Sequence, residues 1–295
     1  MTAAFLTGLG RAALALALGP LAVGVTKRVK ARCQGRRGPP LLQGYYDLAK
    51  WIRKESVVSV HASPLFRATP YALVGSVAAA AAIVPVAGAG GPSIGDLFAL
   101  AGLLALGRFL LALAGLEAGS AFGGMAASRE TMIGALVEPG LILAFAAPAI
   151  AAGSTEPAAI AAARLAAGAP AAGLLLAAAG LLVVSIAETG RVPVDNPDTH
   201  LELTMVHEGM LLEWSGRHLA LAHLAAAAKQ VVLLSVFCAL FLPGGGAFAW
   251  AAKVTALSAL LGLVETANVK MRLFRVPEVL GAAFLLGLAG AFLVS

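Results

Sequence analysis

Titratable side chains concentrate in one segment of the chain, residues 188–217, which lies between two long apolar stretches. The 295-residue chain has only fifteen acidic residues and five histidines. Six of the acids and two of the histidines fall in this segment: Glu188, Asp195, Asp198, Glu202, Glu208, Glu213, His200 and His207. Apolar Met205, Met210 and Trp214 are interleaved with them, so we expect several carboxylates to be partly buried. Burial raises the pKa of a carboxylic acid, and a row of such groups can relay protons. Surface carboxylates that balance a basic loop remain the alternative.

Metal binding is a second use for histidines and carboxylates. His200, Glu202, His207 and Glu208 are residue types that suit zinc. Their spacing does not match the HExxH pattern of a metalloprotease helix, and we predict no metal site here. Cys33 and Cys238 are the only cysteines. Ligation of an iron–sulfur cluster by four cysteines of this chain is therefore excluded, and we expect no cofactor in it.

Further ionisable residues lie inside the apolar stretches. Each costs roughly 2.5–3.5 kcal/mol if it faces lipid, so most are expected to face the bundle interior or water. Glu130 and Glu138 are eight residues apart, roughly 80° around a helix and ~12 Å along it, so they can line one face. These charged groups have two equally good explanations. One is a proton path through Glu130, Glu138 and Glu117, and the other is a set of buried ion pairs that only fix the packing. The ionisable residues inside the apolar stretches also include the basic residues Arg108 and Lys229.

The elements that must position these groups are transmembrane helices. The chain is 60% hydrophobic and 12% charged, with a mean hydropathy of +0.89, whereas soluble domains carry roughly 25% charged residues. We therefore predict an all-α, polytopic membrane protein that forms a single integral membrane domain over residues 1–295. Apolar runs of ~20 residues can cross a bilayer. Eight such runs occur, near Ala4–Thr26, Tyr71–Ala89, Ile94–Glu117, Thr131–Ala152, Ala169–Ala187, Leu219–Leu242, Phe248–Val269 and Pro277–Ser295.

The distribution of Lys and Arg indicates the topology. Sixteen of the 21 fall in segments 27–70, 118–130, 188–218 and 270–276, which alternation puts on one side, and the loops on the opposite side hold only Arg164. The positive-inside rule makes that side cytoplasmic, so loops 27–70 and 188–218 are cytoplasmic and both termini face outward. The net charge of +6 is then a consequence of topology and does not indicate nucleic acid. Within the first loop, apolar and charged residues alternate at helical spacing over residues 41–54, which predicts an amphipathic interfacial helix or a docking surface for a partner.

Three long motifs carry a resemblance to a known family. They are "GRRGPPLLQGYYDLAKWIRKE", "SAFGGMAASRE" and "ETGRVPVDNPDTHLELTMVHEGMLLEWSGR". With them the chain resembles, almost end to end, the membrane anchor subunit that respiratory complex I (subunit 1 or H type) shares with energy-converting group 4 nickel–iron hydrogenases. The details are closer to the formate hydrogenlyase and hydrogenase-4 branch, notably "DNPDTHLE" and His207 before Glu208.

The resemblance implies a non-redox subunit of an oxidoreductase complex in a prokaryotic inner membrane. Such a subunit anchors a cytoplasmic redox module and couples electron transfer to proton or sodium translocation. The implied partners are hydrogenase-like large and small subunits, iron–sulfur proteins, antiporter-like membrane subunits and lipids, with iron–sulfur clusters and nickel–iron in the partners. By position, the six loop acids with Glu117, Glu130 and Glu138 are the proton-transfer candidates. The implied partner contacts are Arg36, Arg37, Arg191, His200 and His207. A quinone-reducing NADH dehydrogenase-type subunit and an independent secondary transporter are the alternatives.

Overall fold

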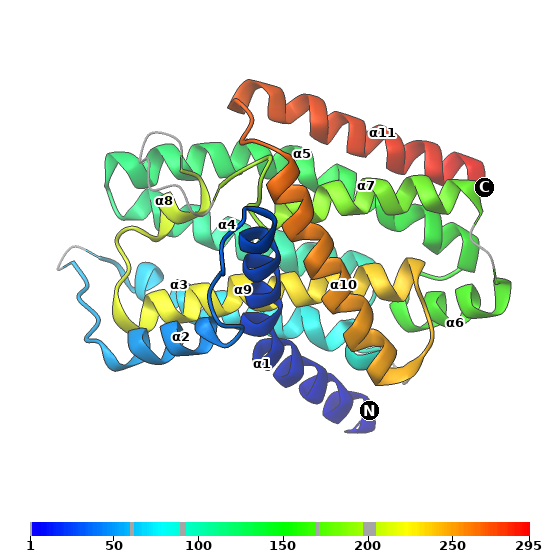
Figure 1. Cartoon of the computed structure of the whole chain (residues 1–295), viewed down its shortest axis with the longest axis horizontal. Helices are drawn as coiled ribbons and strands as arrows, with labels where there is room; N and C mark the ends of the chain where they lie inside the picture. Colours follow the sequence, from blue (N-terminus) through cyan, green and yellow to red (C-terminus); the bar gives the residue numbers. More distant parts are fainter. Residues whose placement is uncertain (1, 60–61, 89–92, 169–170, 197–204) are drawn as a thin grey trace.

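Long helices that run roughly lengthwise make up most of the molecule (Figure 1). The computed structural model describes residues 2–59, 62–88, 93–168, 171–196 and 205–295. Within these ranges every secondary-structure element is a helix. The elements are α1 (Thr2–Cys33), α2 (Gln43–Arg53), α3 (Pro64–Ile83), η1 (Val86–Gly88), α4 (Leu97–Glu117), α5 (Ala121–Ala152), α6 (Pro157–Ala167), α7 (Ala172–Glu188), α8 (His207–Leu211), α9 (Gly216–Phe241), α10 (Gly246–Ala267), η2 (Leu273–Arg275) and α11 (Val276–Val294).

The prediction of a polytopic all-α membrane protein is confirmed, with a difference of one in the count of spans. Among the described residues, seven helices are long and apolar enough to cross a membrane. The predicted span that is missing from this count is the fifth, Ala169–Ala187, which corresponds to α7. This helix has 17 residues and a length of about 26 Å at 1.5 Å per residue. That is a few ångströms less than the ~30 Å hydrocarbon core of a bilayer.

Several predicted boundaries were wrong because helices continue beyond the apolar runs. Helix α1 extends past Thr26 through a basic stretch to Cys33, and α5 begins at Ala121, ten residues before Thr131. Each has 32 residues, about 48 Å, so both project beyond the hydrocarbon core. Helix α6 was not predicted as a separate element, since its Ala-rich sequence has no polar edge.

Capping residues define where three of the spans begin. Ser63 Oγ accepts the backbone N–H of Leu65 at the start of α3, where Pro64 occupies the first helical position. Asp96 caps α4 in the same way, and Ser120 caps α5. Each cap satisfies a backbone donor that has no partner within the helix.

Helix α9 lies at the centre of the bundle and packs against α1, α2, α3, α6, α7 and α10. Its apolar side chains, such as Val231 and Leu233, are fully buried in the core. Helix α11 packs on α5 and α7 at the periphery. There Gly173 and Gly290 allow close approach, because a Cβ added to either would lie 2.6 Å from the carbonyl oxygen of the other.

The two ends of the bundle differ in what they carry. Helices α2 and α8 lie at one end, α6 and the C-terminus lie at the other, and the N-terminus lies at the lower edge of the view (Figure 1). The predicted amphipathic helix over residues 41–54 is present as α2, which packs on α1 and α9. Short helical structure in the acidic segment is present as α8.

Candidate functional site

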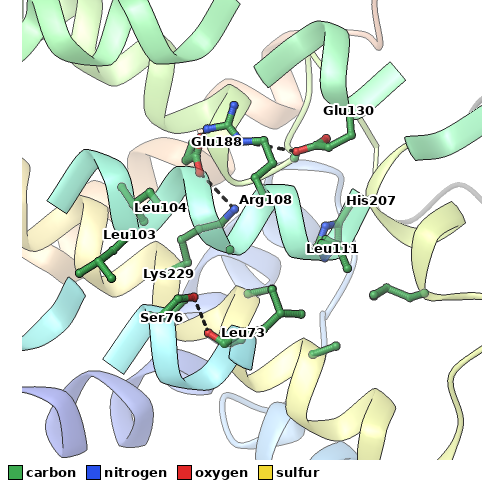
Figure 2. Close-up of a pocket in the computed structure, with 17 residues that line it drawn as sticks. Leu73, Ser76, Leu103, Leu104, Arg108, Leu111, Glu130, Glu188, His207 and Lys229 are labelled. Carbon is green, nitrogen blue, oxygen red and sulfur yellow. Dashed lines mark hydrogen bonds and ion pairs between the residues drawn. The ribbon is translucent and has the colours of Figure 1, made fainter. Parts of the chain in front are cut away.

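Four charged side chains meet inside the bundle, and we call them the inner cluster: Arg108, Glu130, Glu188 and Lys229. They come from α4, α5, α7 and α9 (Figure 2). Arg108 donates a short hydrogen bond to Glu188 Oε2, and Lys229 Nζ lies 3.4 Å from Glu188 Oε1. Arg108 Nε lies 3.9 Å from Glu130 Oε1. The Glu188 side chain is fully buried, and these two cations are placed to compensate a buried carboxylate.

A glycine makes room for the arginine of this cluster. A Cβ added to Gly134 of α5 would lie 2.7 Å from Arg108 Nη1 and 3.0 Å from its Cδ. Beside the cluster is a cavity of about 40 Å³, the inner cavity, which Glu130, Glu188 and Lys229 help to line. A water molecule needs roughly 10–15 Å³ on this measure and two to four polar partners, so the inner cavity can hold water.

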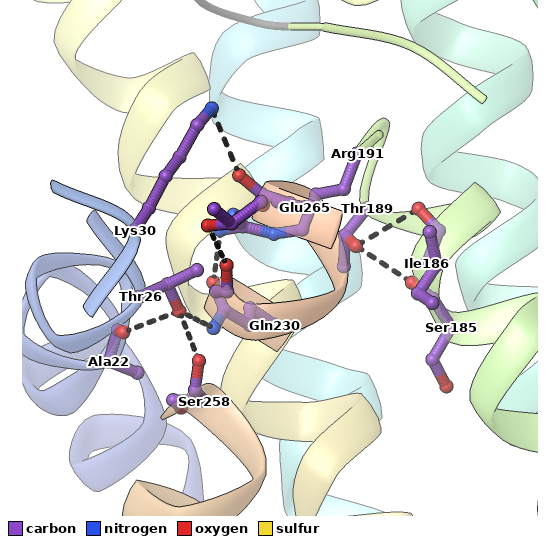
Figure 3. Close-up of polar contacts among 12 residues, drawn as sticks. Ala22, Thr26, Lys30, Ser185, Ile186, Thr189, Arg191, Gln230, Ser258 and Glu265 are labelled. Atoms are coloured by element: carbon purple, nitrogen blue, oxygen red, sulfur yellow. Dashed lines mark hydrogen bonds and ion pairs between the residues drawn. The ribbon is translucent and has the colours of Figure 1, made fainter. Parts of the chain in front are cut away.

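A second buried network surrounds Arg191, where the chain leaves α7 (Figure 3). Arg191 Nη1 donates to Glu265 of α10, and its Nη2 donates to Gln230 Oε1 of α9 at 2.6 Å. Lys30 of α1 lies 3.2 Å from the second oxygen of Glu265. Gln230 in turn donates to the hydroxyl of Thr26 at 3.1 Å. This network joins α1, α9 and α10 to the start of the acidic segment.

Asp195 forms a third buried contact point in the same segment. Its side chain accepts a hydrogen bond from Lys270 Nζ at 2.7 Å and from the backbone N–H of His207 at 3.1 Å. The carbonyl of Pro193 accepts the backbone N–H of Met271 at 2.9 Å. The segment that follows α7 is therefore held against the connection between α10 and α11.

A larger cavity of about 190 Å³ lies between α1, α2, α9 and the acidic segment, and we call it the α2 chamber. Its wall combines charged and aromatic groups, including Asp47, Glu208 and Arg191. Trp51 of α2 stacks on His223 of α9, with ring centroids 4.6 Å apart and planes inclined by 19°. The amphipathic helix α2 thus forms one side of a polar chamber.

The surroundings of His207 strongly affect the protonation of its imidazole. Burial, followed by the positive charges of Lys229 and His223, lowers the pKa of His207 to about 3, although Asp195 opposes this shift. Its Nε2 is buried and has no hydrogen-bond partner among the residues that the structure describes. The imidazole is therefore neutral at physiological pH.

The fold and these charge clusters can be compared with known proteins. A family model described as NADH dehydrogenase matches residues 8–295, nearly the whole chain. The chain belongs to this family. Hydrogenase-4 component C of Escherichia coli (strain K12) is 40% identical over 246 residues, which cover 81% of this chain and 76% of that relative. Formate hydrogenlyase subunit 4 of the same strain is 34% identical over 292 residues, 93% of each chain.

A solved structure supports the fold of this NADH dehydrogenase family member. The membrane-bound sulfane sulfur reductase, an archaeal respiratory membrane complex, contains a chain that matches with a TM-score of 0.85. The match covers 99% of this chain and 100% of that one at 22% identity, so the likeness is one of fold. The family resemblance expected from the three sequence motifs is confirmed.

The structure brings together about half of the predicted site residues. Glu130 and Glu188 belong to the inner cluster, and Asp195 lies next to His207. Glu208 and His207 line the α2 chamber, as does the predicted partner contact Arg191. These residues surround the point where α7 leads into the acidic segment.

Other predicted residues lie apart from this point. Glu138 and Glu213 are exposed, as are Arg36 and Arg37. Glu117 Oε1 accepts the backbone N–H of Ser63 at 2.7 Å, so this carboxylate joins the ends of α4 and α3. Asp198, His200 and Glu202 lie outside the described residues. In the described part of the chain, no three His, Cys, Asp or Glu side chains are grouped as metal ligands.

Three cationic partners of the buried carboxylates, Arg108, Lys229 and Lys30, were not among the predicted site residues, and Arg191 was predicted only as a partner contact. Arg108 and Lys229 pair with Glu188, while Lys30 and Arg191 pair with Glu265. A signal for Arg108 and Lys229 existed, because a charge within an apolar helix requires a partner. The identity of that partner depends on how helices far apart in sequence pack, and a single sequence does not contain this information.

Proposed function

We propose that this chain is the membrane-embedded, non-redox subunit of a complex I-like energy-converting hydrogenase or formate hydrogenlyase-type complex. It anchors a redox module and couples electron transfer in that module to translocation of protons or sodium ions. Its partners are hydrogenase-like large and small subunits and iron–sulfur proteins on one side, and antiporter-like subunits within the membrane. Iron–sulfur and nickel–iron centres belong to those partners.

The inner cluster is the observation that carries the proposal. Glu188 is fully buried between Arg108 and Lys229, and it stands at the end of α7, where the acidic segment begins. Ionisable groups within a membrane bundle are costly and are typical of ion and proton pathways. The segment that follows reaches the Arg191 network and Asp195 within seven residues, so a partner that moves this segment changes charge contacts in the bundle.

The family relatives support the hydrogenase branch of the proposal. Both curated relatives carry hydrogenase or formate hydrogenlyase names, which favours this branch over a quinone-reducing subunit. An independent transporter is disfavoured by the position of the charged groups, which lie where α7 meets its loop. We place the end that carries α2 and α8 on the cytoplasmic side of a prokaryotic inner membrane, because the loop over residues 27–70 holds ten of the 21 Lys and Arg residues of the chain.

Glu188→Gln in the intact complex tests this function. Inverted membrane vesicles are assayed for turnover of the redox module with an artificial electron carrier and for ion uptake during coupled turnover. Removing a proton-transferring side chain is expected to lower coupled ion uptake about tenfold or more. Turnover with the artificial carrier and assembly of the complex should be retained, because Gln preserves the shape of the side chain.

Glu278→Gln is the matched control, since this carboxylate is exposed on α11. It should behave like the wild type. Repeating the assay with potassium in place of sodium separates proton from sodium translocation. Unchanged ion uptake in Glu188→Gln would refute the proposed coupling role.

A further inference from the structure

The inner cavity and the α2 chamber are separated by a thin wall. Among the residues that the structure describes, two are common to the linings of both: His207 of α8 and Ala226 of α9. Of these two, His207 alone has a side chain that can bind a proton. Figure 2 shows His207 at the inner cavity, and in this view Arg108 lies between His207 and Glu188.

The surroundings of His207 fix its position and leave one ring nitrogen without a partner. Its backbone N–H donates to Asp195 Oδ2 at 3.1 Å. Gly190 lies against the side chain, because a Cβ added there would be 3.5 Å from His207 Cβ. Nε2 is buried and makes no hydrogen bond to any described residue. A buried polar atom without a partner is costly, and its retention calls for an explanation.

We propose that His207 is the proton-transferring connection between the α2 chamber and the inner cluster. The inference rests on the proposed coupling function and assigns to one side chain the step by which protons enter or leave the cluster. His207 was predicted as a partner contact, so this is a different role for it.

The transfer step requires no group other than water and the residues of the two cavities. A neutral imidazole has one N–H and one lone pair. A proton from water in the α2 chamber binds at the free nitrogen, and the proton on the other nitrogen leaves through water in the inner cavity to a carboxylate, Glu188 or Glu130. The product is the opposite tautomer of the neutral ring. Rotation of the ring about Cβ–Cγ leaves the tautomer unchanged but turns the N–H toward the inner cavity and the lone pair toward the α2 chamber, so that the next proton can be transferred. Transfer in the reverse direction follows the same steps.

Burial and the neighbouring charges keep His207 neutral between transfers. Burial disfavours the imidazolium most, Lys229 and His223 of α9 add to this effect, and Asp195 of the acidic segment opposes it. The remaining titratable or charged groups of the two cavities are Arg108, Glu130 and Glu188 on the inner side and Lys27, Asp47, Arg191 and Glu208 on the chamber side. A ring that is neutral at rest accepts a proton only in passing, as a relay requires.

Substitution of His207 in the intact complex tests the proposal. His207→Gln is expected to reduce coupled proton uptake by inverted vesicles about tenfold or more, with turnover by an artificial electron carrier retained. His207→Glu, which keeps a group that binds and releases protons, should retain more uptake than His207→Gln. In His207→Ala, added imidazole should restore uptake in a saturable way, because the α2 chamber has room for it. His218→Gln is the control, since His218 lies outside both cavities and contacts Tyr71.

The outcomes separate this inference from the proposed function. If Glu188→Gln abolishes coupled uptake and His207→Gln does not, the relay role is refuted and the proposed function stands. Normal uptake in both variants refutes the proposed function itself. Loss of uptake in His207→Ala with no response to imidazole, together with equal loss in His207→Glu, assigns His207 a structural role and overturns the proposal. If His207→Gln fails to assemble, the His207→Ala and His207→Glu variants decide between the relay role and the structural role by the same criteria.

Discussion

Removal of Glu265 should destabilise the bundle more than any single surface substitution. This carboxylate lies between Arg191 and Lys30, and its side chain is only 4% exposed. Arg191 is 10% exposed and Lys30 is 15% exposed. Within the described part of the chain, Glu265→Ala therefore leaves the buried Arg191 with Gln230 as its one side-chain acceptor, while Lys30 can extend toward water.

The cost follows from the burial of the arginine. Removing one partner of a buried ion pair costs about 3–5 kcal/mol, because the remaining charge is left without compensation. We expect this loss for Glu265→Ala. Glu265→Gln keeps an acceptor for Arg191 but not the charge, and the loss should be about 1–3 kcal/mol. The double variant Glu265→Leu with Arg191→Met removes both charges and should lie closer to the wild type than Glu265→Ala.

Unfolding of the purified chain in mixed micelles measures these differences. Its three tryptophans report the transition as the denaturing detergent is increased. Glu278→Ala, at an exposed position, should stay within about 0.5 kcal/mol of the wild type. If Glu265→Ala matches this control, or if the double variant is less stable than Glu265→Ala, the network does not stabilise the bundle by charge pairing and the reasoning is wrong.

Two further predictions concern the inner cluster and His207. Gly134→Ala places a methyl group 2.7 Å from Arg108 Nη1 and should displace that guanidinium. Coupled ion uptake in vesicles should therefore fall. Gly124→Ala is the control, because a methyl group at this position of the same helix meets nothing within 4 Å and should not change uptake. His207 has its pKa lowered to about 3, so between pH 6.5 and 3 the unfolded chain binds a proton that the folded chain does not. The free energy of unfolding should therefore fall as the pH falls through this window. His207→Gln should show a smaller fall in the same titration, and an identical pH dependence would contradict the prediction.

The transmembrane architecture was predictable because apolar run length and charge asymmetry are local properties of a sequence. The residues at which the helices begin and end were less predictable. Residues 27–33 of α1 and 121–130 of α5 are not apolar enough for the membrane core, yet they continue as helix outside it. Helix α6 is as apolar as a span but has only 11 residues between Pro157 and Gly168. Hydropathy alone does not distinguish such a short helix from the flank of a span.

The carboxylates of the site were predictable because acids are rare in this chain and apolar residues surround them. Their partners were not. Arg108 is 80 residues from Glu188, and Lys229 is 41 residues from it. The convergence of α4, α5, α7 and α9 on one point is a tertiary property. For the same reason, Glu138 is exposed although it lies two turns along the helix from Glu130.

A proton path and buried ion pairs that fix the packing are compatible explanations for the charges in this bundle. Glu188 attracts Arg108 and Lys229 only while it is ionised, so a proton on Glu188 removes the attraction that holds both cations. A movement that draws either cation away breaks an ion pair of this buried carboxylate. Arg191 and Asp195 tie the next seven residues to α10 and to its connection with α11, so a displacement of this segment acts on all three clusters together. In the coupling that we propose, these ion pairs link the position of the segment to the charges inside the bundle.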